Sequence, residues 1–151
     1  MSHSILIIED QDADFEAIER GLRRVGIEYP VVRCTNAEDA LDYLYGRGKH
    51  RHDPDWQLPT IVLLDLRLDG GDGREVLARA KQDDYLKAIP IIVWSGSTDP
   101  QDVEISYRLG ANSFVRKTFD FAEVQRTLER VALFWLETAV LPLRADVRRE
   151  S

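Results

Sequence analysis

The sequence predicts an α/β fold built on a doubly wound, five-stranded parallel sheet. Short apolar runs bounded by polar residues have the composition of buried parallel strands. Segments with helical spacing of apolar residues lie between them, and such alternation gives right-handed crossovers with helices on both faces of the sheet. The 151 residues are 44% hydrophobic and 31% charged, which suits a single domain with a sizeable core.

Five strands are expected in chain order. Their apolar runs are residues 5–8, 31–32, 61–64, 91–94 and 114–115. Each run is short, and polar residues follow it at once. Five helices are expected between and after the strands. The first has apolar residues at spacings of three and four, namely Phe15, Ile18, Leu22 and Val25.

The later helices begin at residues that cap helix N-termini well. Asn36 with Asp39 three positions on resembles a capping box, and Asp99 is followed by a proline suited to the first helical turn. The expected N-caps are Asn36, Asp72, Asp99 and Asp120, and the glycines expected to close the first and fourth helices are Gly26 and Gly110.

One connection is long for such a fold. Residues 46–56 are polar and contain glycine, which predicts a mobile surface loop. Its ionisable residues could in principle bind a metal, but their spacing fits no strong ligand pattern, so a solvated loop is favoured. These residues are His50, His52, Asp53 and Asp55.

Composition argues against several classes of partner. The net charge of −7, from 20 basic and 27 acidic residues, disfavours direct nucleic-acid binding, which needs a basic face. No apolar run approaches the ~20 residues of a membrane span. The first residues do not resemble a signal peptide, and the single cysteine, Cys34, is expected to pack rather than to pair. A cytoplasmic compartment is therefore expected.

The polar residues that end the strands suggest a site. Glu9 and Asp10 follow the first run, Asp65 follows the third, and Ser95 and Lys117 follow the last two. Parallel strands bring these endings to one edge of the sheet, where open α/β sheets bind ligands. Three carboxylates repel each other unless a cation joins them, and oxygen ligands suit Mg²⁺. A lysine and a serine beside them suit a phosphoryl group.

In this order the residues resemble the receiver domain of two-component response regulators, a flavodoxin-like fold. The resemblance covers roughly residues 4–135 and includes Asp65-Leu66-Arg67-Leu68, residues 72–77 and Gly110-Ala111-Asn112. The long loop before the third strand and residues 134–139 resemble, more narrowly, the stand-alone regulators that partner bacterial phytochrome histidine kinases.

The resemblance implies a role for each residue. Asp65 would accept a phosphoryl group from a phosphohistidine of a sensor histidine kinase, and Ser95 and Lys117 would bind its oxygens. Mg²⁺ would be held by Asp65, directly by Asp10, through water by Glu9, and by the backbone carbonyl of Arg67. The expected protein is no enzyme in the usual sense but a phospho-acceptor with self-catalysed phosphotransfer and dephosphorylation.

The resemblance also implies a conformational switch formed by Ser95 and the aromatic residue of the fifth strand. That residue is Phe114, which has no hydroxyl, so its two states would differ by packing alone.

Two positions depart from the family pattern. Thr118 follows Lys117 where the family usually has proline in a cis bond, and a cis bond before a non-proline costs about 2.5–4 kcal/mol. Either this bond is trans and the loop shifts, or it is strained. Asp69-Gly70-Gly71 stands where proline is frequent, so a mobile loop is expected there.

The end of the chain predicts self-association. The face of the last helix with Val124, Leu128, Val131 and Trp135 should pack on the sheet. Gln125, Arg126 and Glu129 should point away, and Leu133, Leu136 and Val140 should continue this outward side as a homodimer interface. Cover by the chain's own tail, residues 141–143, is the alternative.

The whole of residues 1–151 is expected to form one receiver domain, with its core at about 4–135 and a helix extension and tail at about 133–151. Only nine residues follow Pro142, too few for an output domain, so the signal should leave through the receiver surface.

Two rival functions remain open. A Mg²⁺-dependent phosphatase of the haloacid dehalogenase type also forms an aspartyl phosphate, but it usually has a second aspartate two residues after the nucleophile, where this chain has Arg67. An unphosphorylated dimeric interaction module is the other rival, and the intact set of strand-end residues argues against it.

Overall fold

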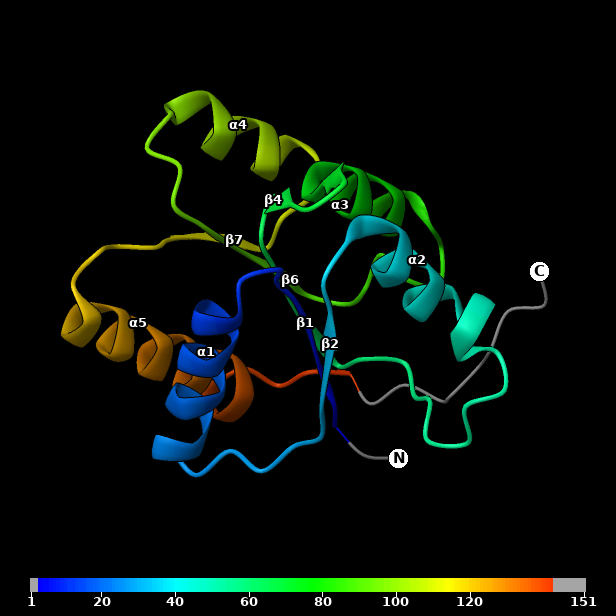
Figure 1. The fold of residues 1–151 in the computed structure, drawn as a ribbon, viewed down its shortest axis with the longest axis horizontal. Coiled ribbons are helices and arrows are strands. Elements are labelled where there is room, and N and C mark those ends of the chain that lie inside the picture. The colour runs from blue at the N-terminus through cyan, green and yellow to red at the C-terminus, as the bar shows by residue number, and fades with distance from the viewer. Residues whose placement is uncertain (1–2, 143–151) are drawn as a thin grey trace.

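The computed structural model describes residues 3–142, and these form a five-stranded parallel sheet with helices on both faces (Figure 1). The strands are β1 (Ile5–Ile8), β2 (Val31–Cys34), β3 (Ile61–Leu64), β6 (Ile91–Ser95) and β7 (Ser113–Arg116), in the order β2-β1-β3-β6-β7. Ile8 pairs with both Cys34 and Leu64, and Ser95 pairs with Arg116. The strands therefore finish close to one line, as predicted.

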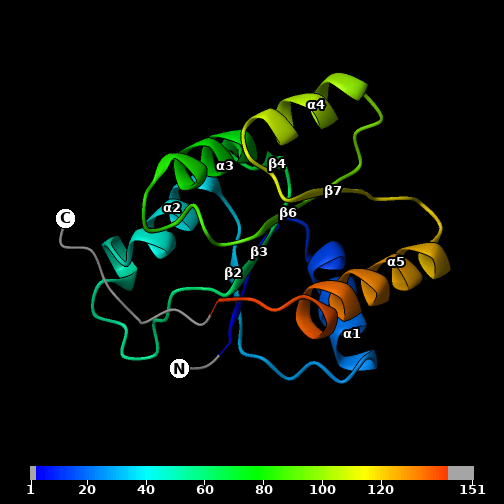
Figure 2. The same cartoon turned by 180° about the vertical axis from the view of Figure 1, so that it is seen from behind.

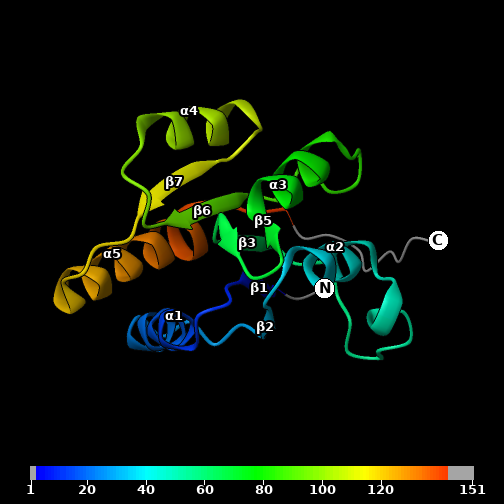
Figure 3. The same cartoon turned by 45° about the horizontal axis from the view of Figure 1, so that its top comes forward.

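Two helix layers enclose the sheet because each strand presents alternate residues to opposite faces. The helices are α1 (Asp12–Arg24), α2 (Ala37–Tyr45), α3 (Gly73–Gln82), α4 (Pro100–Arg108) and α5 (Phe121–Leu133). Figures 1 and 2 show α1 and α5 side by side on one face, with α2, α3 and α4 on the other. Ile5 and Ile7 pack toward α1 and α5, whereas Leu6 and Ile8 pack toward α2 and α3. Figure 3 shows the sheet between these layers.

The predicted helix caps are confirmed. The side chain of Asn36 accepts a hydrogen bond from the Asp39 amide at 2.8 Å, and Asp72, Asp99 and Asp120 cap their helices in the same way. The side chain of Asp39 does not complete a capping box with Asn36. It contacts His50 instead, which bears on the long connection before β3.

The segment of residues 46–56, predicted to be a mobile surface loop, lies mostly at the surface but contains a short helical turn and a buried anchor. Gly48–His50 forms a 3₁₀ turn, η1, and Trp56 is only 5% exposed. The Trp56 indole donates to the backbone oxygen of Tyr43 at 2.8 Å, and the Tyr43 hydroxyl donates to the backbone oxygen of Gln57 at 3.0 Å. Burial of these aromatic rings fastens the connection to α2.

The loop expected to be mobile at residues 69–71 is the turn of a small hairpin. Two short antiparallel strands, β4 (Arg67–Leu68) and β5 (Gly71–Asp72), flank Asp69 and Gly70, and Gly70 has a φ of +71°. A left-handed residue suits such a turn, and glycine adopts that conformation without strain. The hairpin lies directly after Asp65, at the edge where the strands end.

The C-terminal helix departs from the predicted pattern in two places. Gln125, predicted to point outward, is 4% exposed, and its amide donates to the backbone oxygen of Ala17 in α1 at 3.4 Å. The two helices approach closely there, because a Cβ on Gly21 would lie only 2.9 Å from Cβ of Leu128. This close approach covers the side of α5 that carries Gln125.

After α5 the chain forms one π-helical segment, η2 (Phe134–Thr138), in which the Ala139 amide donates to the Phe134 oxygen at 2.6 Å. This wider turn shifts the helical periodicity, so Leu136, predicted to point outward, packs against the core instead. Leu141 packs against the same cluster, while Leu133 is 40% and Val140 98% exposed. Leu143 and the rest of the expected tail lie outside the described residues.

Within residues 3–142, the helices are all too short or too polar to cross a membrane.

Candidate functional site

The structure brings the predicted site residues together at one edge of the sheet. Glu9 and Asp10 follow β1, Asp65 follows β3, Ser95 ends β6 and Lys117 follows β7. The amide of Asp65 donates to the Ile8 oxygen at 2.9 Å, and that of Lys117 donates to the Ser95 oxygen at 2.8 Å. The sheet hydrogen bonding thus continues one residue beyond the strands and fixes where these side chains emerge.

Lys117 is the central cation of the site. Its ammonium lies 2.7 Å from Oε1 of Glu9, 2.9 Å from Oδ2 of Asp14 and 3.1 Å from Oδ2 of Asp65, and its side chain is 16% exposed. The sequence did not single out Asp14. It lies in the first turn of α1, and its contact with Lys117 depends on how α1 packs on the sheet, which no local sequence pattern marks.

The charges of Glu9 and Lys117 are coupled. Burial raises the pKa of Glu9 to about 8, against the opposing effect of the Lys117 ammonium, and the nearby Asp65 charge adds to the rise. Burial also acts to lower the pKa of Lys117, but hydrogen bonds to Glu9 and Asp14 outweigh it and hold that pKa above its usual value. The lysine therefore stays charged, while the buried glutamate holds a proton unusually well.

Three carboxylates converge beside this lysine. Oxygens of Glu9, Asp10 and Asp65 lie within 4.8 Å of one another. Asp65 accepts from the Arg67 amide at 3.2 Å, and Asp10 accepts from the Asp69 amide of the hairpin turn at 3.1 Å. One lysine does not neutralise this set, and hard oxygen donors in excess suit a divalent cation. The residues present therefore fit a metal ion.

The carboxylates and Lys117 lie beside a cavity of about 450 Å³. Residues lining it include Asp10, Asp14, Asp65, Arg67, Ser95 and Lys117. Asp65 is 7% exposed at its floor, so a small anionic group could reach it beside both the carboxylates and the ammonium. An open, polar pocket with a carboxylate beside an ammonium group suits the binding of a small charged group.

Ser95 is only 1% exposed, and its hydroxyl accepts from the Ser97 amide at 3.2 Å. Ser97 in turn hydrogen-bonds to Asp102 of α4, and Arg74 of α3 forms an ion pair with Asp102 at 2.6 Å. No sequence pattern marks this network. It connects the end of β6 to α3 and α4, two helices on the same face of the sheet.

Phe114 and Thr118 flank the site on the β7 side. Phe114 is half-buried and packs against the cluster under α2 and α3, and its amide donates to the Tyr107 hydroxyl at 3.1 Å. No cis peptide bond occurs among residues 3–142, so the Lys117–Thr118 bond is trans, the first of the two alternatives that the sequence left open.

The fold and the site together define a class of protein, an α/β domain in which three carboxylates and a lysine meet at the carboxyl edge of a parallel sheet. Residues 5–129 match the response regulator receiver domain, and this chain belongs to that family.

Particular relatives are similar over nearly the whole chain. Response regulator Rcp1 from Synechocystis is 34% identical over 138 residues, which cover 91% of this chain and 92% of that protein. The phosphorylated cyanobacterial phytochrome response regulator RcpA has a similar structure, with a TM-score of 0.87 and 34% identity, covering 95% of this chain and all of that one. The Mn²⁺-bound form of Rcp1 gives a TM-score of 0.87 at 33% identity, covering 93% and 99% of the two chains.

The narrower resemblance seen in the sequence is thereby confirmed: this is a receiver-domain response regulator whose homologues include phytochrome response regulators.

Proposed function

We propose that this receiver takes a phosphoryl group from a sensor histidine kinase onto Asp65. The observation that carries the proposal is the ion pair between Asp65 and Lys117 at the floor of an open polar cavity. An oxygen of Asp65 attacks phosphorus, the bond from phosphorus to the histidine nitrogen breaks, and the nitrogen keeps the electron pair. Lys117 stabilises the charge on the phosphoryl oxygens, which is the main protein contribution to such transfers.

The divalent cation is proposed to be Mg²⁺, held by Asp10, Asp65 and the backbone carbonyl of Arg67, with Glu9 acting through water. A divalent ion would neutralise phosphoryl charge during transfer. The supporting observation is the set of three carboxylates within 4.8 Å, and a relative binds the chemically similar Mn²⁺.

The partner kinase is proposed to be a bacterial phytochrome, because RcpA is a phytochrome response regulator and has a similar chain over nearly its full length. The kinase obtains its phosphoryl group from cytoplasmic ATP, so the cytoplasm is the proposed compartment. Direct binding to nucleic acid needs a basic face, and the net charge of −7 disfavours one. We therefore propose that the surface of the receiver domain itself carries the output. In this proposal the protein is a phospho-acceptor, and Asp65 does not catalyse the turnover of a separate substrate.

The test uses a small acyl phosphate in place of the kinase. With Mg²⁺ present, the intact chain should gain the mass of one phosphoryl group, and a chelator should prevent it. Absence of any gain with Mg²⁺ would contradict the proposal. Sustained release of phosphate from a phosphomonoester would instead support the phosphatase reading.

Metal affinity should distinguish the two acidic residues after β1. Asp10→Asn should weaken Mg²⁺ binding more than Glu9→Gln, because Asp10 is proposed as a direct ligand, whereas Glu9 is turned toward Lys117. Fluorescence of Trp94, next to Ser95, offers the readout, with calorimetry as a second measure. The reverse ranking would exchange the roles assigned to the two residues.

We also propose a homodimer formed through the exposed apolar residues at the C-terminal end of the described chain. Leu133, Phe134 and Val140 are 40%, 53% and 98% exposed. Leu136, which the sequence placed in this interface, packs against the core instead. A second copy would cover the same residues by a symmetric contact.

Charges on this surface should separate the copies. Leu133→Glu combined with Val140→Glu should give a folded monomer, because both positions are exposed and desolvating the new carboxylates at a contact is costly. Sedimentation at tens of micromolar measures the oligomeric state, and circular dichroism measures whether the variant is folded. Tyr85→Glu, at a 52% exposed position after α3, is the control that should remain dimeric. A monomeric parent, or a dimeric double variant, would exclude the contact.

A further inference from the structure

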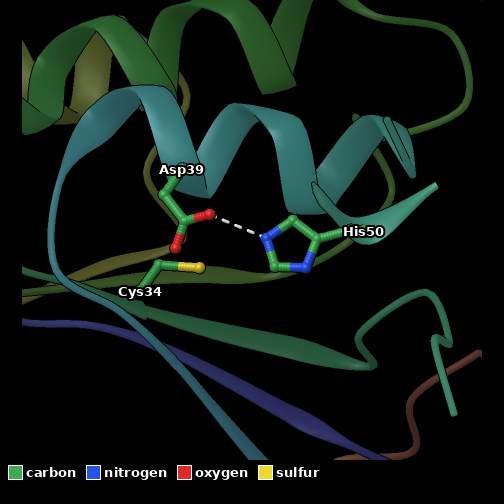
Figure 4. A group of neighbouring side chains, drawn as sticks. All are labelled: Cys34, Asp39 and His50. Carbon is green, nitrogen blue, oxygen red and sulfur yellow. Dashed lines mark hydrogen bonds and ion pairs between the residues drawn. The ribbon is translucent and has the colours of Figure 1, made fainter. Parts of the chain in front are cut away.

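A second group of potential metal ligands lies away from the acidic edge. Cys34 at the end of β2, Asp39 in α2 and His50 in η1 point toward one another (Figure 4). A sulfur, a carboxylate oxygen and a ring nitrogen from these residues lie within 4.8 Å of one another. The residues come from three separate elements, so their convergence is a property of the fold and not of local spacing.

Packing fixes the position of His50. Its ring meets that of Tyr43 edge-to-face at 5.0 Å, and its amide donates to the Arg47 oxygen at 3.2 Å. Gly48 allows the turn, with a φ of +61° and no room for a Cβ beside the Asp42 carboxylate at 2.7 Å. Because Trp56 anchors the far end of the connection, the histidine is held against α2 before any ligand arrives.

The Asp39 carboxylate lies at the centre of this group and is satisfied by its neighbours. Nε2 of His50 lies 2.7 Å from Oδ1 of Asp39, and the Lys49 ammonium lies 3.3 Å from the same oxygen. Burial acts to raise the pKa of Asp39, but the hydrogen bonds from His50, Cys34 and Lys49 hold it below its usual value. Asp39 is therefore a carboxylate that an imidazole, a thiol and an ammonium group surround.

Cys34 is poorly suited to redox or nucleophilic chemistry. Its side chain has no exposed surface, and burial, aided by the charge of Asp39, raises the pKa of its thiol above the usual value. A buried thiol of this kind is inert unless a metal ion displaces its proton.

From this geometry we propose that Cys34, Asp39 and His50 bind one Zn²⁺ ion. Zinc binds thiolate, imidazole and carboxylate ligands at about 2.0–2.3 Å, so its ligand atoms lie roughly 3–4 Å apart. Small side-chain shifts close the observed separations to that range. The thiolate and the carboxylate together balance the charge of the ion, and water takes the fourth position.

Solvent can reach the site from one side. The side chains of Asp39 and His50 are 15% and 13% exposed, and Lys49 is 71% exposed and can turn away from the carboxylate. On binding, the thiol proton leaves to solvent, and the hydrogen bond between His50 and Asp39 is exchanged for bonds to the ion. The ion then joins β2, α2 and η1, which stiffens the connection between α2 and β3.

The chain offers an unambiguous optical test because Cys34 is its only cysteine. Co²⁺ replaces Zn²⁺ in such sites, and its bond to a thiolate gives a charge-transfer absorption. Excess Mg²⁺ occupies the carboxylates of the acidic edge during the titration. The full chain should develop this absorption up to one equivalent of Co²⁺, and one equivalent of Zn²⁺ should remove it. No thiolate absorption would overturn the proposal.

Two variants and a matched control locate the ion. Cys34→Ser should lose the absorption, and His50→Gln should weaken Co²⁺ binding by more than tenfold, since loss of even a supporting residue costs roughly 10–100-fold. His52→Gln, an exposed histidine of the same connection, should leave affinity unchanged. Equal loss in His50→Gln and His52→Gln would overturn the assignment. Because Cys34 is fully buried and His50 is only partly buried, the His50 variant keeps the test decisive if Cys34→Ser unfolds.

Discussion

Asp65→Asn should abolish phosphorylation of the chain. The asparagine has nearly the same shape but an amide that does not attack phosphorus, so the fold should be kept while the nucleophile is lost. The Asp65 carboxylate contacts Lys117 and also accepts from the Arg67 amide, which fixes it at the cavity. Mass spectrometry after incubation with an acyl phosphate and Mg²⁺ should show no gain in mass.

The matched control for this variant is Asp84→Asn. Asp84 is an exposed carboxylate paired with Lys87 on the turn after α3, far from the acidic edge in sequence and fold. It should be labelled like the parent. Labelling of Asp65→Asn to the parent level would place the acceptor elsewhere and remove the basis of the proposed function.

Gly73→Ala should be the most destabilising single-methyl change near the site. Gly73 begins α3, and its amide donates to the Leu66 oxygen at 2.8 Å, which brings the backbone against the residue that follows β3. A Cβ there would lie 2.2 Å from the backbone oxygen of Asp65 and 2.9 Å from Cα of Leu66. Backbone atoms cannot rotate away, so the free energy of unfolding should fall by about 3 kcal/mol or more.

Urea denaturation measures this loss, with Gly96→Ala as the control. Gly96 lies on the loop after β6, its φ is not positive, and a Cβ there would meet nothing within 4 Å. That variant should change stability by less than about 0.5 kcal/mol. A Gly73→Ala protein as stable as Gly96→Ala would show that the backbone of α3 moves freely relative to Asp65.

The sequence was sufficient for the sheet and for the residues along its edge. Apolar runs that end in a polar residue mark both the strand and the place where its last side chain emerges, so Glu9, Asp65, Ser95 and Lys117 could be placed together. Caps were equally readable, because a cap such as Asn36 acts on amides two or three residues away.

What the sequence could not show depends on contacts between distant elements. Asp14 reaches Lys117 only because of how α1 lies on the sheet. His50 meets Cys34 only because Trp56 anchors a connection whose composition resembles a free loop. Leu136 was misplaced because a single π-helical turn breaks the 100° periodicity on which the prediction depended. The first two omissions come from tertiary packing, and the third comes from a local break in the helical periodicity.

The three ion pairs of Lys117 limit how this lysine can bind a phosphoryl group. An ammonium has three hydrogens, and in the described structure Glu9, Asp14 and Asp65 each lie within hydrogen-bond distance of it. A phosphoryl oxygen can be bound only if one of these carboxylates is released. Asp14 is the most exposed of the three, at 42% of its side chain, and water can replace its bond at least cost. If Asp65 is phosphorylated as proposed, the reaction is a ligand exchange at an occupied lysine, and α1 loses its contact with the segment after β7 as the acyl phosphate forms.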